Sequence, residues 1–221
     1  MIVTETSDLF AAAEMLSKCF EQDVPWKIRN LLVQESIADK FLNMVKLQPI
    51  NKQLLASCES ELSSTLDKFS KMGLELIQNP NDNNKLKATI VKCSRNLVSD
   101  QNSVIPIVTM EIFRTSKEAI SLANSSVKDS VSLWCENVSS VYEYTKGLNC
   151  YQIWVNSNGI LNKQFPFLFG DKFMYGEEFL KSGLKSTTEI IGNVHFETTL
   201  LKGDTTKSLT VVIPFGSTFA N

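Results

Sequence analysis

The sequence predicts an α/β protein built on a parallel sheet with helices on its faces. Short apolar segments rich in β-branched residues alternate along the chain with amphipathic segments of helical length. The 221 residues can form one large domain or two small ones with a substantial core. A composition of 43% hydrophobic and 21% charged residues is typical of a globular protein and argues against disorder.

The spacing of apolar residues in the first third of the chain predicts a strand, a helix, a strand and two more helices. Ile2-Val3 is the tail of a strand, and Ser7 or Asp8 can cap the helix that follows. Residues 28–34 are expected to form a strand and 36–47 a second helix. A longer helix is expected over 52–77, ending near Gly73 or at Asn79-Pro80, and the polar run 79–84 is a turn.

The rest of the chain continues the alternation and then loses it. We expect strands at 88–91, 105–113, 131–135 and 151–155, and helices at 116–123 and 138–146. Residues 156–176 are rich in aromatics and glycine, as in a functional loop or lid. A short helix at 177–184 precedes an alternating strand at 188–199 that can pair with another chain, and 208–215 is a strand or an ill-fitted tail.

Charge and cysteine usage exclude several classes of function. The net charge is −2 without a basic stripe, which argues against nucleic acid or a membrane surface as partner, and no apolar run is long enough to span a membrane. The first residues lack the features of a signal peptide. Five scattered cysteines without a CxxC pair indicate buried, reduced thiols and a cytoplasmic protein. The sequons at Asn124 and Asn137 are then chance matches, and an isolated His195 predicts no metal site.

Motifs for independent nucleotide binding are missing from the sequence. It contains neither Gly-x-Gly-x-x-Gly nor a Walker-type loop. The adjacent carboxylates Glu177-Glu178 suit a solvated helix start better than catalysis. An aromatic group in the loop can line a tunnel or form an apolar patch for a partner; it comprises Phe165, Phe167, Phe169, Phe173 and Tyr175.

Several segments together resemble one known superfamily. The resemblance is carried by Phe113-Arg114-Thr115-Ser116-Lys117-Glu118-Ala119-Ile120, by Ala123-Asn124, by Ser130-Val131-Ser132-Leu133-Trp134, by Tyr151-Gln152-Ile153-Trp154-Val155-Asn156 and by Thr188-Glu189-Ile190-Ile191. Over residues 1–196 the chain is similar to the catalytic region of the aldehyde dehydrogenases. It most resembles the family-sixteen members, many of which lack the catalytic cysteine. The resemblance implies an α/β domain that normally packs against a Rossmann-like NAD(P) domain.

The same resemblance implies that the catalytic groups are missing. The loop that carries the family's nucleophilic cysteine corresponds here to Pro25 and Trp26, which offer neither a thiol nor, at the proline, an N–H donor. Cys19 lies several residues earlier on the apolar face of a helix, where core packing is expected. The family's general-base Glu lies upstream of the matching region, and neither Glu5 nor Glu14 has its glycine-rich setting.

Cofactor and substrate positions are also altered. In the family a Glu and a Phe hold the ribose and the nicotinamide, and the corresponding residues are Asn102 and Val104. The lid reads Pro166-Phe167-Leu168-Phe169, bulkier than the glycines usual there. Asn156 matches an Asn beside the substrate tunnel, so Asn156 and Phe167 are tunnel candidates, although a loop-capping role for the Asn156 amide is equally open.

The apolar patterns that specify the sheet are therefore retained, whereas the residues that carry the family's catalysis and cofactor binding are missing or altered. This combination favours a non-catalytic scaffold or assembly module. We expect a catalytic-domain-like region over 1–185, an oligomerisation-type strand at 186–199 and a tail at 200–221. No cofactor is expected for the chain itself, and the partners are a second copy or a nucleotide domain of the family. Two alternatives remain open: part of an NAD(P)-dependent oxidoreductase acting on aldehydes, and a small-molecule binding module that uses the aromatic loop.

Overall fold

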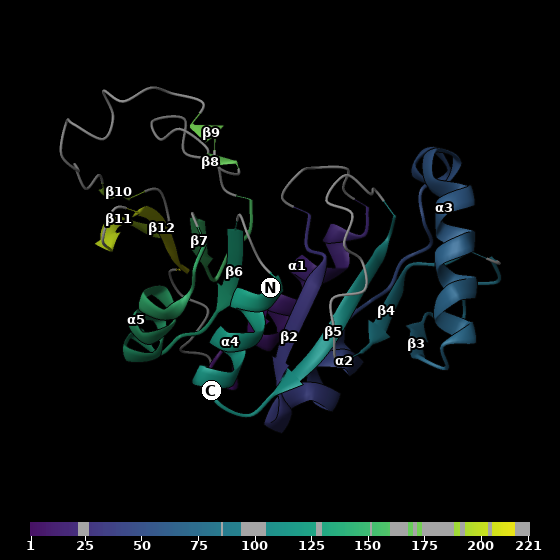
Figure 1. Cartoon of the computed structure of the whole chain (residues 1–221), viewed down its shortest axis with the longest axis horizontal. Helices are drawn as coiled ribbons and strands as arrows, with labels where there is room; N and C mark the ends of the chain where they lie inside the picture. Colours follow the sequence, from purple (N-terminus) through teal and green to yellow (C-terminus); the bar gives the residue numbers. More distant parts are fainter. Residues whose placement is uncertain are drawn as a thin grey trace. The chain divides into compact units, whose positions relative to one another are not determined.

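A computed structural model describes most of the chain. The described residues are 1–21, 27–84, 86–93, 105–126, 130–150 and 152–159, together with the strand segments 168–169, 172–173, 188–190, 193–202 and 205–214. Contacts divide the chain into a first unit, mainly residues 3–115, and a second unit, mainly residues 116–221 (Figure 1). The domain boundaries expected at 185 and 199 fall inside the second unit and stay a prediction.

The first unit is a mostly parallel sheet in the order β2-β5-β4-β3. Its strands are β2 (Asn30–Gln34), β3 (Glu75–Gln78), β4 (Thr89–Lys92) and β5 (Ile107–Phe113). β5 runs parallel to both β2 and β4, and β3 is antiparallel to β4. β1 (Ile2–Val3) follows Met1, whose carbonyl oxygen accepts a hydrogen bond of 2.8 Å from the Leu32 N–H. Nearly continuous burial of β4 and of the first half of β5 is typical of strands covered on both faces.

Three helices accompany this sheet: α1 (Leu9–Cys19), α2 (Ala38–Met44), which follows a 3-10 turn at Glu35–Ile37, and α3 (Lys52–Lys71). Asp8, one of the two expected caps, begins α1, because its carboxylate accepts a hydrogen bond of 3.0 Å from the Ala11 N–H. The buried face of α1 contains Ala12, Ala13, Leu16 and Cys19, as the apolar spacing predicts.

The long third helix ends earlier than its furthest expected limit. Gly73 has φ 70°, its N–H donates to Ser70 O, and the Leu74 N–H donates to Phe69 O. These two bonds form a Schellman motif, which a glycine in the left-handed region completes at low cost. Of the two expected ends, the one near Gly73 is therefore confirmed, and the one at Asn79-Pro80, with the helix continuing to Ile77, is wrong. Residues from Glu75 onward instead pair with β4 as strand β3.

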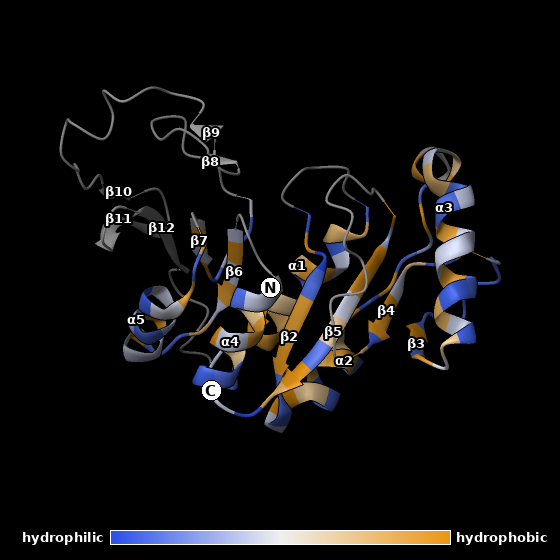
Figure 2. Cartoon of the chain, viewed as in Figure 1, coloured by the Kyte–Doolittle hydropathy of each residue, from blue (hydrophilic) through white to orange (hydrophobic). Residues whose placement is uncertain are grey.

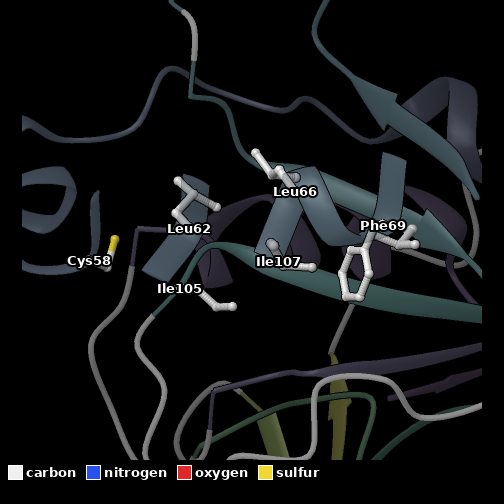
Figure 3. Close-up of a cluster of buried hydrophobic side chains, with 7 residues drawn as sticks. Cys58, Leu62, Leu66, Phe69, Ile105 and Ile107 are labelled. Carbon is white, nitrogen blue, oxygen red and sulfur yellow. The ribbon is translucent and has the colours of Figure 1, made fainter. Parts of the chain in front are cut away.

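An apolar cluster joins α3 to the sheet (Figure 3). Cys58, Leu62, Leu66 and Phe69 follow one another at helical spacing and pack with Val91, Ile105 and Ile107. Each large side chain buried in this way contributes about 1.5 to 3 kcal/mol relative to exposure. In Figure 2, β4 is coloured as hydrophobic, whereas α3 alternates between hydrophobic and hydrophilic residues along its length. Burial of one face of an amphipathic helix therefore anchors α3.

The second unit begins with a helix, which is followed by a β-α-β arrangement. α4 (Ser116–Ser126) leads to β6 (Ser130–Trp134), and α5 (Val138–Gly147) connects β6 to the parallel strand β7 (Gln152–Val155). Asn137 caps α5 by accepting a hydrogen bond of 3.1 Å from the Ser140 N–H. The Asn124 amide donates to Gly147 O and accepts from the Asn149 N–H, so it fastens the end of α5 to α4. Both sequon asparagines therefore have structural hydrogen bonds.

The C-terminal segment adds further strands to the second unit. β12 (Thr205–Pro214) pairs in parallel with β7 and antiparallel with β11 (Asn193–Lys202), which in turn pairs antiparallel with β10 (Thr188–Ile190). The short strands β8 (Leu168–Phe169) and β9 (Lys172–Phe173) pair with each other. The single strand expected over 188–199 is wrong, because these residues contribute to two strands, β10 and β11, which pair antiparallel with each other. The expected helix at 177–184 lies outside the described residues.

The predicted fold class, a mostly parallel α/β sheet flanked by helices, is confirmed. The strand alternative for residues 208–215 is also confirmed, since β12 includes most of them. None of the helices in the described part of the chain combines the length and the hydropathy of a membrane-spanning segment.

Candidate functional site

The carboxyl ends of parallel strands are the usual location of ligand sites in α/β proteins. In the second unit, β6 and β7 end next to each other, with Leu133 opposite Val155 in the register. The residues that follow are Cys135 and Asn156, the latter a tunnel candidate from the sequence. This strand edge is therefore the candidate site.

The Asn156 side chain bonds to the main chain of Cys135 through both of its polar atoms. Its Oδ1 accepts a hydrogen bond of 2.9 Å from the Cys135 N–H, and its Nδ2 donates at 3.2 Å to the Cys135 carbonyl. The Asn156 N–H donates at 2.8 Å to Leu133 O. Asn156 also has φ 53°, in the left-handed region that asparagine tolerates better than most residues. The amide thus joins the ends of two strands, while its tunnel role stays a prediction.

A second chain of hydrogen bonds lies beside it and is buried. The Trp134 indole N–H donates to Ser132 Oγ at 2.9 Å, and the Ser132 hydroxyl donates to Ser157 O at 2.7 Å. Ser132, Trp134 and Ser157 are all buried. Because buried polar groups are costly unless paired, this network fixes the loop after β7 against β6.

The Cys135 thiol is also enclosed. Its Sγ contacts Asn137 O at 3.5 Å, and the residue is buried. Burial, together with the nearby Cys135 and Glu143, raises the pKa of the Tyr144 hydroxyl well above its usual range. The Tyr144 hydroxyl therefore stays protonated at physiological pH.

In the first unit, the thiol nearest in sequence to the lost nucleophile is Cys19. Its side chain is completely buried at the end of α1. Burial raises the pKa of the Cys19 thiol to about 12, although the Lys27 ammonium and the amino terminus act in the opposite direction. A thiol in this state is protonated at neutral pH, and the thiolate is the nucleophilic form. Cys19 therefore has the environment of a core residue.

The five cysteines all lie within the described residues and form no disulfide. The expected burial is confirmed for Cys19, Cys58, Cys135 and Cys150, whereas Cys93 is partly exposed.

The carboxylates considered as bases have structural partners. Glu5 accepts a hydrogen bond of 3.0 Å from the Ser36 hydroxyl. Glu14 forms an ion pair of 2.7 Å with Lys18, one turn later, and this contact lowers the pKa of the Glu14 carboxyl. A general base near neutral pH needs a raised carboxyl pKa, so the shift at Glu14 has the wrong direction for that role.

At the carboxyl ends of β2 and β5, Glu35 and Arg114 form a two-pronged ion pair. Arg114 Nε and Nη2 donate to the two carboxylate oxygens at 2.9 Å each. Both side chains are largely exposed, so the pair contributes about 1 kcal/mol at most to stability. The geometry ties two neighbouring strand ends in the first unit, as Asn156 does in the second.

Several residues singled out in the sequence lie outside the described residues. They are Pro25 and Trp26, which follow α1 in the sequence, Asn102 and Val104, which precede β5, and Phe167. Their assignments stay predictions. Within the described residues, the structure shows no cluster of three or more metal-ligating side chains.

The Ser132, Trp134 and Ser157 network was not anticipated from the sequence. A serine alternating with a tryptophan on a strand gives no signal of a buried hydrogen bond between them. A partial signal was available at Asn156-Ser157-Asn158, because such residues directly after a strand favour side chain to main chain bonds.

Comparison with solved structures places this architecture among the aldehyde dehydrogenases. An NAD-dependent aldehyde dehydrogenase from Sinorhizobium meliloti matches at 18% identity with a TM-score of 0.61, covering 75% of this chain and 38% of that one. KauB, an aldehyde dehydrogenase from Pseudomonas aeruginosa, matches at 22% identity with a TM-score of 0.62, covering 75% and 39%. Betaine aldehyde dehydrogenase from Staphylococcus aureus, in complex with NAD+, matches at 21% identity with a TM-score of 0.59, covering 75% and 38%.

At these identities the likeness shows the fold, and the chain spans about two fifths of the length of these structures. The finer resemblance to the family-sixteen members stays a prediction. Residues 1–219 match a family described as "Protein of unknown function (DUF1487)". The match extends over nearly the whole sequence, and the chain belongs to this DUF1487 family.

Proposed function

We propose that the chain is a non-catalytic, aldehyde dehydrogenase-related module that acts as a scaffold or assembly unit. The observation that carries this proposal is the environment of Cys19. A thiol that replaced the lost nucleophile would have to be accessible and ionised near neutral pH. Cys19 is instead buried, with its pKa raised to about 12.

Two further features support the proposal. The loop position of the family nucleophile carries Pro25 and Trp26 in the sequence. Asn156, the family position that this chain keeps, bonds to the main chain of Cys135 with both ends of its amide. The module would then hold no cofactor of its own, act in the cytoplasm, and assemble with a second copy or with a nucleotide domain of the aldehyde dehydrogenase type.

The test is an aldehyde oxidation assay on the purified chain. NAD+ or NADP+ is mixed with short, branched, aromatic and amino aldehydes, and reduced cofactor is followed by its absorbance. We expect no rate above buffer, while an active aldehyde dehydrogenase in the same cuvette conditions gives turnover. The matched control is Cys19→Ala. Turnover by the unmodified chain that disappears in Cys19→Ala would overturn the proposal.

A second candidate is favoured by the coverage of the structural matches. Because the chain spans about two fifths of those dehydrogenases, a nucleotide domain on another part of the same protein could complete a dehydrogenase. Calorimetric titration of NAD+ into the product of the full transcript separates the two readings. Tight binding together with aldehyde turnover supports the oxidoreductase, and binding without turnover supports the module.

A further inference from the structure

One side of α5 is fastened to α4. A Cβ on Gly147 would meet Ile120 Cδ1 at 2.7 Å, so the end of α5 lies directly against α4. Glu143 accepts a hydrogen bond of 2.7 Å from the Ser116 hydroxyl, at the start of α4. Figure 1 marks these two helices, which also share the Asn124 bond to Gly147. The contacts fix which face of α5 turns toward its neighbour.

The opposite face carries an exposed stripe, which consists of Val138, Tyr142 and Lys146. At about 100° per residue, Val138 lies roughly opposite Gly147 on the helix. Val138 is 78% exposed and Tyr142 is 53% exposed. The Lys146 ammonium lies 4.3 Å from the centroid of the Tyr142 ring, so a cation covers one end of the apolar surface.

Opposite charges lie near the two ends of α5. Glu136 is exposed just before the N-terminal end of α5, and Lys146 is exposed in its last turn. A surface with an apolar centre and opposite charges at its two ends is complementary to itself after a rotation of 180° about an axis through the centre. Such self-complementarity is the requirement for an isologous, two-fold interface.

We propose that the stripe is the contact surface for a second copy of this chain, with the two α5 helices antiparallel and Tyr142 at the two-fold axis. Lys146 lies four residues, about 6 Å along the helix, from Tyr142. Because the partner helix runs in the opposite direction, the residue that faces Lys146 at this distance from the axis is the partner's Val138. The partner's Glu136 precedes Val138 by two residues and is close enough for the Lys146 side chain to reach. Each Lys146 therefore meets an apolar surface and a carboxylate of the other copy.

The charges distinguish this arrangement from its alternatives. In a parallel pair, Lys146 would face Lys146 and Glu136 would face Glu136, and like charges that close together are repulsive. The antiparallel pair also aligns the two helix dipoles favourably. One helix from each copy is a small interface, so the association belongs to the weak, concentration-dependent class. The inference rests on the proposed function, because it names the partner of the assembly unit.

The test is sedimentation equilibrium of the purified chain from micromolar to millimolar concentration, at low and at high salt. We expect a monomer–dimer equilibrium that is stronger at low salt, since the charge pairs lie at an exposed edge. Lys146→Glu or Glu136→Lys alone should weaken the dimer about 2- to 30-fold, because each exposed pair occurs twice. The double reversal, Glu136→Lys with Lys146→Glu, should restore it.

Controls separate association from folding. Tyr142→Ala should abolish the dimer, whereas Phe10→Ala, which truncates a 67% exposed aromatic on α1, should leave it intact. Circular dichroism establishes that each variant is folded. A chain that stays monomeric throughout, or a dimer that neither Tyr142→Ala nor the charge reversals affect, overturns the inference. Aldehyde turnover would refute the proposed function without changing the sedimentation result. Failure of the proposed function and failure of the dimer inference are therefore distinguishable.

Discussion

Replacement of Asn156 tests whether its amide holds the carboxyl end of the second unit's sheet together. Asn156→Ala removes the two hydrogen bonds to Cys135, each with a net value of about 0.5 to 1.5 kcal/mol. It also places an alanine at φ 53°, which costs about 1 to 2 kcal/mol in the left-handed region. We expect the free energy of unfolding to fall by about 2 to 5 kcal/mol.

Asn156→Gly separates the two contributions. Glycine adopts φ 53° without a steric penalty but has no amide, so only the hydrogen bonds are lost. The expected loss is about 1 to 3 kcal/mol, smaller than for alanine.

Urea unfolding with an unchanged m-value gives the free energies, and hydrogen exchange at the Cys135 N–H reports the local bond. A glycine variant less stable than the alanine variant would refute the backbone argument. Losses below about 0.5 kcal/mol in both variants would refute the role of the amide.

Further predictions concern the packing at Gly147 and the buried thiol of Cys19. Gly147→Ala should destabilise the fold by about 1 to 3 kcal/mol, because its Cβ would lie 2.7 Å from Ile120 Cδ1 and 2.9 Å from Ile120 Cγ2. Adding Ile120→Ala in the same chain should recover part of this loss. A double-mutant cycle measured by thermal unfolding checks both expectations. The Cys19 thiol should resist iodoacetamide in the native state. Since its folded pKa of about 12 exceeds the reference value of 9.0, the unfolded chain loses this proton first, and stability should fall as pH rises from 9 toward 12, less steeply in Cys19→Ala. Rapid native labelling, or equal alkaline slopes, would contradict this.

The fold was largely readable from the sequence because local patterns determine it. Buried strands such as β4 and β5 are short runs of β-branched and apolar residues, and the face of α1 that includes Cys19 follows helical spacing. The errors occurred where two periodicities compete. Residues 75–77 continue the apolar spacing of α3, but the left-handed Gly73 ends that helix and pairing with β4 makes them a strand.

The candidate site was less readable, because its contacts join residues far apart in the chain. The Asn156 amide meets a main chain 21 residues earlier. The bond depends on the parallel register of β6 and β7 and on a positive φ, neither of which the sequence states. Similarity to a family identified the residue. Only the geometry shows that its polar atoms bond to Cys135.

The polar side chains at the ends of β6 and β7 form their hydrogen bonds within the chain, and this is relevant to the function. A catalytic site holds donors or acceptors in place while leaving them directed at a substrate, so it departs locally from full hydrogen bonding. At the ends of β6 and β7, the Asn156 amide, the Ser132 hydroxyl and the Trp134 indole each bond within the chain. Substitution of polar side chains that bond only within the chain should lower the free energy of unfolding and leave ligand binding unaffected. The α/β fold usually places its chemistry at this edge, and the bonding of these polar groups within the chain is the outcome expected under the proposed non-catalytic module.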